Sequence, residues 1–150
     1  MADQFVVFVL GEQRYALRLS AVDRVVRMVQ IAMLLKAPDV VLGVVNVQGC
    51  VLPVISLRRR FRLPEREIGM DDQLVIAHTA RRAVALVVDA VTDVIDCSGR
   101  ELVAPQGIIS AAENLSGIIK GEDGLILVHD LDVFLSQEEE NFLDQALEAP

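Results

Sequence analysis

Residues 42–58 read LGVVNVQGCVLPVISLR and contain the pattern that decides the fold. Two runs rich in valine, leucine and isoleucine flank the dipeptide Gln48-Gly49. A glycine in a short break between such runs is typical of a β-hairpin turn. We therefore expect the segment from Gly43 to Asn46 to lead into a turn at Gln48-Gly49, and a strand to follow through Val51–Leu57.

The same pattern recurs near the end of the chain and makes the sequence a repeat. Gly43-Val44-Val45 aligns with Gly117-Ile118-Ile119, and Val51–Val54 aligns with Leu125–Val128. Matched apolar segments earlier in the chain extend the repeat to Phe5–Phe8 with Leu74–Ala77, Tyr15–Leu17 with Val84–Leu86, and Val25-Val26 with Val94-Ile95. The sequence thus predicts two copies of one strand plan, at roughly 5–61 and 74–135.

Short strands separated by turns predict a mostly β fold made of two small barrels. In the first copy we expect strands at 4–10 and 15–19, and in the second at 73–78 and 83–88. The span Ser20–Met28 is ambiguous, because Ser20 could cap a helix whereas the valines favour a strand; we expect a short helical turn there.

The C-terminal segment predicts an α-helix over about 137–148. Ser136-Gln137-Glu138-Glu139 is a capping box, and its acidic residues fall in the first turn, where the helix dipole favours them. An apolar stripe follows, formed by Phe142, Leu143, Ala146 and Leu147. We expect this stripe to pack on a barrel, with a frayed tail as the alternative.

Composition argues against several classes of partner. A net charge of −8 and a pI near 4.7 disfavour binding to nucleic acid or to anionic membranes. The one basic cluster, Arg58-Arg59-Arg60 with Arg62 and Arg66, alternates with acids and is interpreted as a solvated loop. No apolar run approaches the roughly 20 residues of a membrane span, and the N-terminus lacks a basic region, so we expect a cytoplasmic protein without direct membrane insertion.

The candidate chemical groups do not form a motif. His78 and His129 have no partner at metal-ligand spacing, so both are interpreted as structural. The cysteines, Cys50 and Cys97, are interpreted as reduced, and a Cys50 nucleophile with His129 and Asp130 lacks any accompanying motif. Gly121–Gly124 carries two carboxylates where a phosphate cradle needs a lysine, and Asp71-Asp72 and Asp130/Asp132 fit no calcium loop. We therefore expect no enzyme activity, no catalytic residue, no metal and no cofactor.

Residues 42–49 and 51–58 resemble the CheW family of chemotaxis coupling proteins, and the resemblance extends over almost the whole chain, including Leu86–Val91 and 117–135. It implies one CheW-like domain over 1–150, made of two five-stranded SH3-like barrels. The subdomain halves are expected at roughly 1–66 and 67–135, with an exchange of strands between them left open. It also implies an adaptor whose partners are the regulatory domain of a CheA-type histidine kinase and the cytoplasmic tip of a chemoreceptor, the latter bound in an apolar groove.

The resemblance also gives candidate residues for the receptor groove: Val22, Arg24, Gly43, Asn46, Gln48, Gly49, Leu74, Ala85, Val91 and Val94. The chain departs from the family pattern at Arg24 and Gln48, where the family often has a glutamate and an arginine, and at Ser56, where it has an aspartate. Two alternative hypotheses explain these departures: an altered choice of receptor, or neutral drift at a surface pair. A paralogue that binds only one partner, in a pilus-motility or developmental system, is the alternative function.

Overall fold

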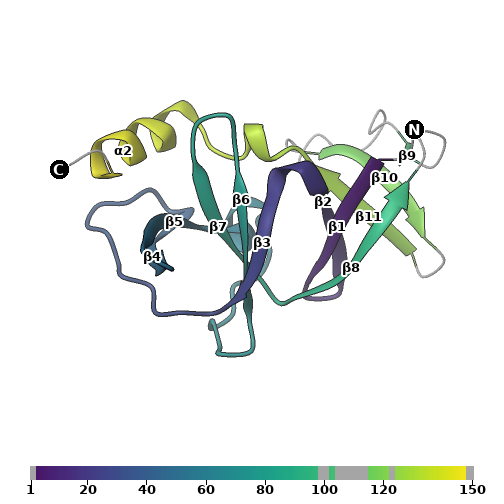
Figure 1. The fold of residues 1–150 in the computed structure, drawn as a ribbon, viewed down its shortest axis with the longest axis horizontal. Helices are drawn as coiled ribbons and strands as arrows, with labels where there is room; N and C mark the ends of the chain where they lie inside the picture. Colours follow the sequence, from purple (N-terminus) through teal and green to yellow (C-terminus); the bar gives the residue numbers. More distant parts are fainter. Residues whose placement is uncertain (1–2, 98–101, 104–114, 122–123, 148–150) are drawn as a thin grey trace.

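The computed structural model describes residues 3–97, 102–103, 115–121 and 124–147 and contains two β-sheets that lie side by side (Figure 1). The first sheet has the strand order β8-β1-β2-β11-β10-β9, and the second has the order β3-β6-β7-β5-β4. The strands of the first sheet are β1 (Asp3–Leu10), β2 (Gln13–Arg18), β8 (Ala90–Cys97), β9 (Leu102–Val103), β10 (Leu115–Gly121) and β11 (Gly124–His129). Those of the second are β3 (Val22–Arg27), β4 (Val41–Val47), β5 (Cys50–Ser56), β6 (Gln73–His78) and β7 (Ala83–Val88).

The predicted fold class is confirmed: the chain is mostly β, with two SH3-like subdomains and a C-terminal helix. The short strand β9 adds a sixth strand to the edge of the first sheet. The helical turn expected over Ser20–Met28 is wrong for most of its length. A 3₁₀ turn, η1, covers only Leu19–Ala21, and β3 follows, because the β-branched valines favour an extended backbone beside β6.

The two sheets exchange hairpins between the halves of the chain. The β1–β2 hairpin pairs with β8 and β11, whereas the equivalent β6–β7 hairpin pairs with β3 and β5. The registers are equivalent too: Phe5 lies opposite Ile95, and its repeat partner Leu74 lies opposite Val26. Each sheet therefore takes strands from both sides of the 66/67 boundary, because these pairings cross it.

Among the described residues, three apolar clusters fill the subdomains and the space between them. One lies in the first subdomain around Phe5, Ala16 and Val128, and one lies in the second around their repeat equivalents Leu74, Ala85 and Val54. The largest joins both subdomains and the C-terminal segment, and it contains Phe8, Tyr15, Leu17, Ile55, Leu57, Val75, Leu86, Leu131, Phe134 and Leu143, among others. Burial of this shared cluster holds the sheets together.

Helix α2 (Gln137–Leu147) lies over the second sheet (Figure 1) and begins at the predicted capping box. The backbone N–H of Ser136 donates to Glu139 at 2.7 Å, and the Glu139 N–H donates to the Ser136 hydroxyl at 3.2 Å. Leu143 is fully buried in the shared core. Ion pairs fix the helix further, since Arg82 in the β6–β7 connection bonds both Glu140 and Asp144.

Gly43 in β4 lies where another part of the backbone crosses the edge of the second sheet. Ala32 and Val44 exchange two backbone hydrogen bonds of 2.8 Å, so the segment after β3 covers this edge. Gly43 has φ +148°, and a Cβ placed there would lie 2.2 Å from the carbonyl oxygen of Ala32. Only glycine satisfies both the backbone conformation and this approach.

We predict that Gly43→Ala lowers the free energy of unfolding by at least about 2 kcal/mol, because it adds backbone strain and overpacking together. Urea unfolding measures the change. Gly11→Ala is the matched control: Gly11 has φ +63° but open space around its Cα, so only the conformational cost of about 1 kcal/mol applies. Equal losses in the two variants would contradict the close approach at Ala32.

Candidate functional site

The candidate site is centred on the turn between β4 and β5. Gln48 and Gly49 both have positive φ, +51° and +87°, which is the backbone of a two-residue turn that matches the twist of a hairpin. The side chain of Asn46 accepts a hydrogen bond from the Gly49 N–H at 2.9 Å. The turn predicted from the sequence is therefore present, and an asparagine side chain fixes its shape.

Arg24 connects this turn to the opposite edge of the second sheet. Its guanidinium donates a hydrogen bond to the side-chain carbonyl of Gln48. Strand β3, which carries Arg24, and strand β4 lie at the two edges of the sheet order, so the contact joins edges that the backbone leaves apart. The two residues singled out as a changed pair in the sequence are thus in direct contact.

A shallow apolar concavity lies beside the turn. It has a volume of about 510 Å³, and its lining includes Val29, Val44, Val51 and Asn46. Val51 is 56% exposed although it is a large apolar side chain. Exposed apolar surface next to fixed polar groups is typical of a partner-binding surface rather than of a catalytic pocket.

The structure brings only some of the predicted groove residues to the surface. Arg24, Asn46, Gln48 and Gly49 are exposed around the turn, and Val94 is exposed on β8 of the other sheet. Val22 and Val91 are half-buried and pack against the shared core.

Three of the predicted groove residues need correction. Gly43 is buried, and its role is the close approach to Ala32. Leu74 and Ala85 have 0% exposure in the core of the second subdomain, so neither can contact a partner. Their positions on central strands β6 and β7, facing inward, explain this.

Ser56, the third departure from the family pattern, is also structural. It is largely buried at the end of β5, and its hydroxyl accepts a hydrogen bond from the Arg59 N–H at 3.2 Å. It therefore caps the short helix α1 (Leu57–Arg60).

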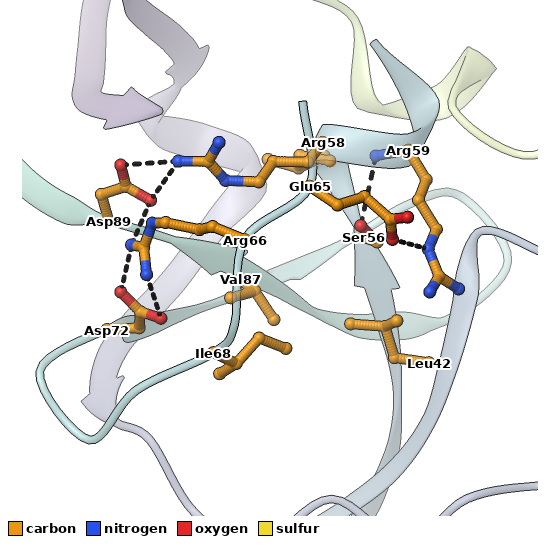
Figure 2. A pocket seen from close by; sticks show the side chains of 11 residues that line it. Leu42, Ser56, Arg58, Arg59, Glu65, Arg66, Ile68, Asp72, Val87 and Asp89 are labelled. Atoms are coloured by element: carbon orange, nitrogen blue, oxygen red, sulfur yellow. Dashed lines mark hydrogen bonds and ion pairs between the residues drawn. The ribbon is translucent and has the colours of Figure 1, made fainter. Parts of the chain in front are cut away.

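A charged network at the junction of the sheets was not anticipated from the sequence (Figure 2). Asp89 occupies the single residue between β7 and β8, where the chain crosses from the second sheet to the first. Its carboxylate accepts hydrogen bonds from the Gly11 N–H at 2.7 Å, from Arg58 at 2.9 and 3.0 Å, and from Arg66 at 2.6 Å. Arg66 also pairs with Asp72, which is largely buried.

Opposing effects act on the pKa of Asp89. Burial raises it, but hydrogen bonds from Gly11, Arg58 and Arg66 stabilise the carboxylate, and the net pKa lies below its usual value. The adjoining pocket, of about 220 Å³, is lined by Arg58, Arg59 and Arg66 together with Glu65, Asp72 and Asp89, so its charges are matched within the protein. We therefore interpret the residues that line this pocket as a structural link between the two sheets.

The interpretation of the arginine cluster as a solvated loop is wrong for Arg58, Arg59 and Arg60, which are half-buried in helix α1, whereas Arg62 and Arg66 are exposed in the loop that follows. Arg58, Arg59, Arg60 and Arg66 each pair with a carboxylate, and Arg62 alone has no such partner within the described residues. The sequence signal that could have predicted this pairing is the presence of five arginines in a short stretch of a chain rich in carboxylates.

The remaining chemical groups have structural surroundings. His78 contacts Asp23 at 2.9 Å across β3 and β6, and His129 stacks on Phe61 with ring centroids 4.3 Å apart. Cys50 is exposed on β5, in the sheet that does not contain His129. Within the described ranges no group of three His, Cys, Asp or Glu side chains could hold a metal ion, and no helix is long and apolar enough to cross a membrane. Residues 122–123, part of the rejected phosphate cradle, lie outside the described residues.

Comparisons with known proteins give one consistent result. The family model for the CheW-like domain matches residues 4–139. Chemotaxis protein CheW of Klebsiella aerogenes is 30% identical over 147 residues, covering 96% of this chain and 88% of its own, and that of Rhizobium meliloti is 30% identical over 140 residues, covering 91% and 90%. The crystal structure of the scaffolding protein TtCheW from Thermoanaerobacter tengcongensis superposes with a TM-score of 0.84 at 28% identity, over 93% of this chain and 96% of that one.

We predict that Asp89→Asn lowers the free energy of unfolding by about 1–3 kcal/mol at pH 7, because it weakens several hydrogen bonds to a half-buried charge. The pKa of Asp89 is lower in the folded protein than in the unfolded chain, where an aspartate has a pKa of about 4. The ionised carboxylate therefore stabilises the fold fully above the unfolded-state pKa, and this stabilisation is lost as the pH falls through the folded-state pKa. Urea unfolding between pH 7 and pH 3 should show the gap between wild type and variant closing. The exposed Asp93, replaced by Asn, is the control; a gap of the same size for both variants would rule out the network.

Proposed function

The chain belongs to the family of CheW-like domains, and from that membership we propose that it is a non-enzymatic scaffold of a bacterial chemosensory array. In this role it couples chemoreceptors to a CheA-type histidine kinase. The observation that carries the proposal is the match over nearly the full length of relatives named chemotaxis protein CheW, together with the same fold in a scaffolding protein.

The architecture supports a protein with two partners. The hairpin exchange produces two subdomains of equivalent register that share one core, so each presents its own outer surface. We propose that one subdomain face binds the regulatory domain of the kinase and that a groove binds the helical cytoplasmic tip of the receptor. Because both proposed partners present these surfaces inside the cell, the proposal includes a cytoplasmic location.

The candidate receptor surface is the exposed part of the predicted set. Arg24, Asn46, Gln48 and Gly49 surround the β4–β5 turn, and the valine concavity beside the turn offers apolar area to a helix. Val94 on β8 is 54% exposed and contributes an apolar side chain from the first sheet. A helix that lies in an apolar groove is recognised by such spaced contacts.

A scaffold function also accounts for how the charged side chains are used. Arginines and carboxylates at the sheet junction bond one another, and those near α2 fix that helix to the β6–β7 connection. These groups stabilise the fold and hold two binding faces at a fixed separation. We therefore propose that the protein positions its partners relative to one another and catalyses no reaction itself.

We predict that the chain forms a ternary complex with a CheA regulatory domain and a chemoreceptor tip fragment from the same genome. Size-exclusion chromatography with light scattering should show each binary complex and then the ternary one. Because a bridging protein in large excess occupies each partner separately, a tenfold excess of the chain should reduce the amount of ternary complex. Binding to neither partner would overturn the proposal, and binding to one alone would restrict it to a single-partner role.

A further inference from the structure

Arg24 differs from most arginines of this chain in what its guanidinium contacts. Among the described residues, seven arginines pair with carboxylates: Arg18, Arg58, Arg59, Arg60, Arg66, Arg81 and Arg82. Arg24 donates instead to the neutral amide of Gln48. Within the described part of the chain, neither Arg24 nor Arg27, which lies further along the same strand, forms an ion pair with a carboxylate.

The Gln48 contact positions this charge without reducing it. One amide oxygen accepts from one N–H, whereas a guanidinium carries five donors, so the others remain available to a partner. The turn that carries Gln48 is itself fixed by the Asn46–Gly49 hydrogen bond and by positive φ angles at Gln48 and Gly49. Arg24 is thus an oriented cation on an exposed edge strand.

The surroundings of Arg24 indicate what kind of partner would contact it. The valine concavity, with Val51 exposed, borders the same turn and includes Asn46 in its lining. An oriented cation next to an apolar hollow is complementary to a carboxylate next to an apolar side chain. On a helix, residues three or four positions apart share one face and present both groups together.

We propose that Arg24 is a specificity-determining residue that selects a helical partner presenting a carboxylate beside its apolar stripe. This inference rests on the proposed function, in which that helix belongs to the receptor tip. The chain has a net charge of −8, which disfavours an acidic helix in general, and the oriented, unneutralised charge of Arg24 favours one position and register of the helix.

The test measures the affinity of the same-genome receptor tip fragment for three variants by isothermal titration calorimetry. Arg24→Gln removes the charge, and Gln48→Glu neutralises it internally by giving Arg24 a carboxylate partner. We expect each to weaken binding three- to tenfold and to reduce the loss of affinity between 50 and 300 mM NaCl. Arg62→Gln is the matched control, since Arg62 is also exposed and without a carboxylate partner among the described residues but lies after α1; its affinity should stay within twofold of wild type.

Mutations in the receptor fragment identify the carboxylate that contacts Arg24. Glutamates and aspartates of the receptor fragment are changed singly to amides, and a double-mutant cycle with Arg24→Gln should assign the coupling to one of them. Binding by wild type with affinity unchanged in Arg24→Gln would overturn the role of Arg24 and leave the scaffold proposal standing. Absence of binding by wild type itself would instead overturn the scaffold proposal.

Discussion

The hydrogen bonds of the Asp89 carboxylate are the contacts on which the arrangement of the two sheets depends. The chain passes from one sheet to the other at this residue, and the bonds reach the β1–β2 turn at Gly11, the helix α1 at Arg58 and the following loop at Arg66. The turn joins two strands of the first sheet, and α1 and the loop follow β5 of the second, so one carboxylate links segments attached to both sheets. Burial of the apolar cluster shared by the sheets stabilises their packing. The hydrogen bonds of the network determine the orientation of one sheet relative to the other, because hydrogen bonds require a specific geometry whereas apolar contacts do not.

Much of the fold could be predicted from local patterns in the sequence. The β-branched runs, the glycine-bearing turns and the capping box at Ser136 gave most of the strands, the β4–β5 turn and helix α2, because each depends on residues close in sequence. The hairpin exchange could not be derived in that way. Alternation of apolar residues determines which face of a strand is buried, but it does not specify which strand lies beside it. For the same reason, Leu74 and Ala85 could be recognised as apolar but not as fully buried.

The candidate site was predictable in part. Arg24 and Gln48 were identified by their departure from a family pattern, and the structure shows them in contact between the two edges of the second sheet. The Asp89 network was missed because its members are far apart in sequence and because a run of arginines resembles a solvated loop. In an acidic chain, however, that many arginines have carboxylates available, and pairing across the fold is the expected outcome.

The hairpin exchange also has a consequence for how the protein is synthesised. Strand β2 pairs in parallel with β11, so Arg14 lies opposite Ile126, a residue that leaves the ribosome after most of the chain. The β1–β2 hairpin must therefore remain unpaired on that side during translation, while the second sheet already has all its strands once residue 88 has emerged. Pairings this distant in sequence are slow to form. The nascent chain thus carries an open strand edge at β2, on which other chains can pair until the last strands arrive.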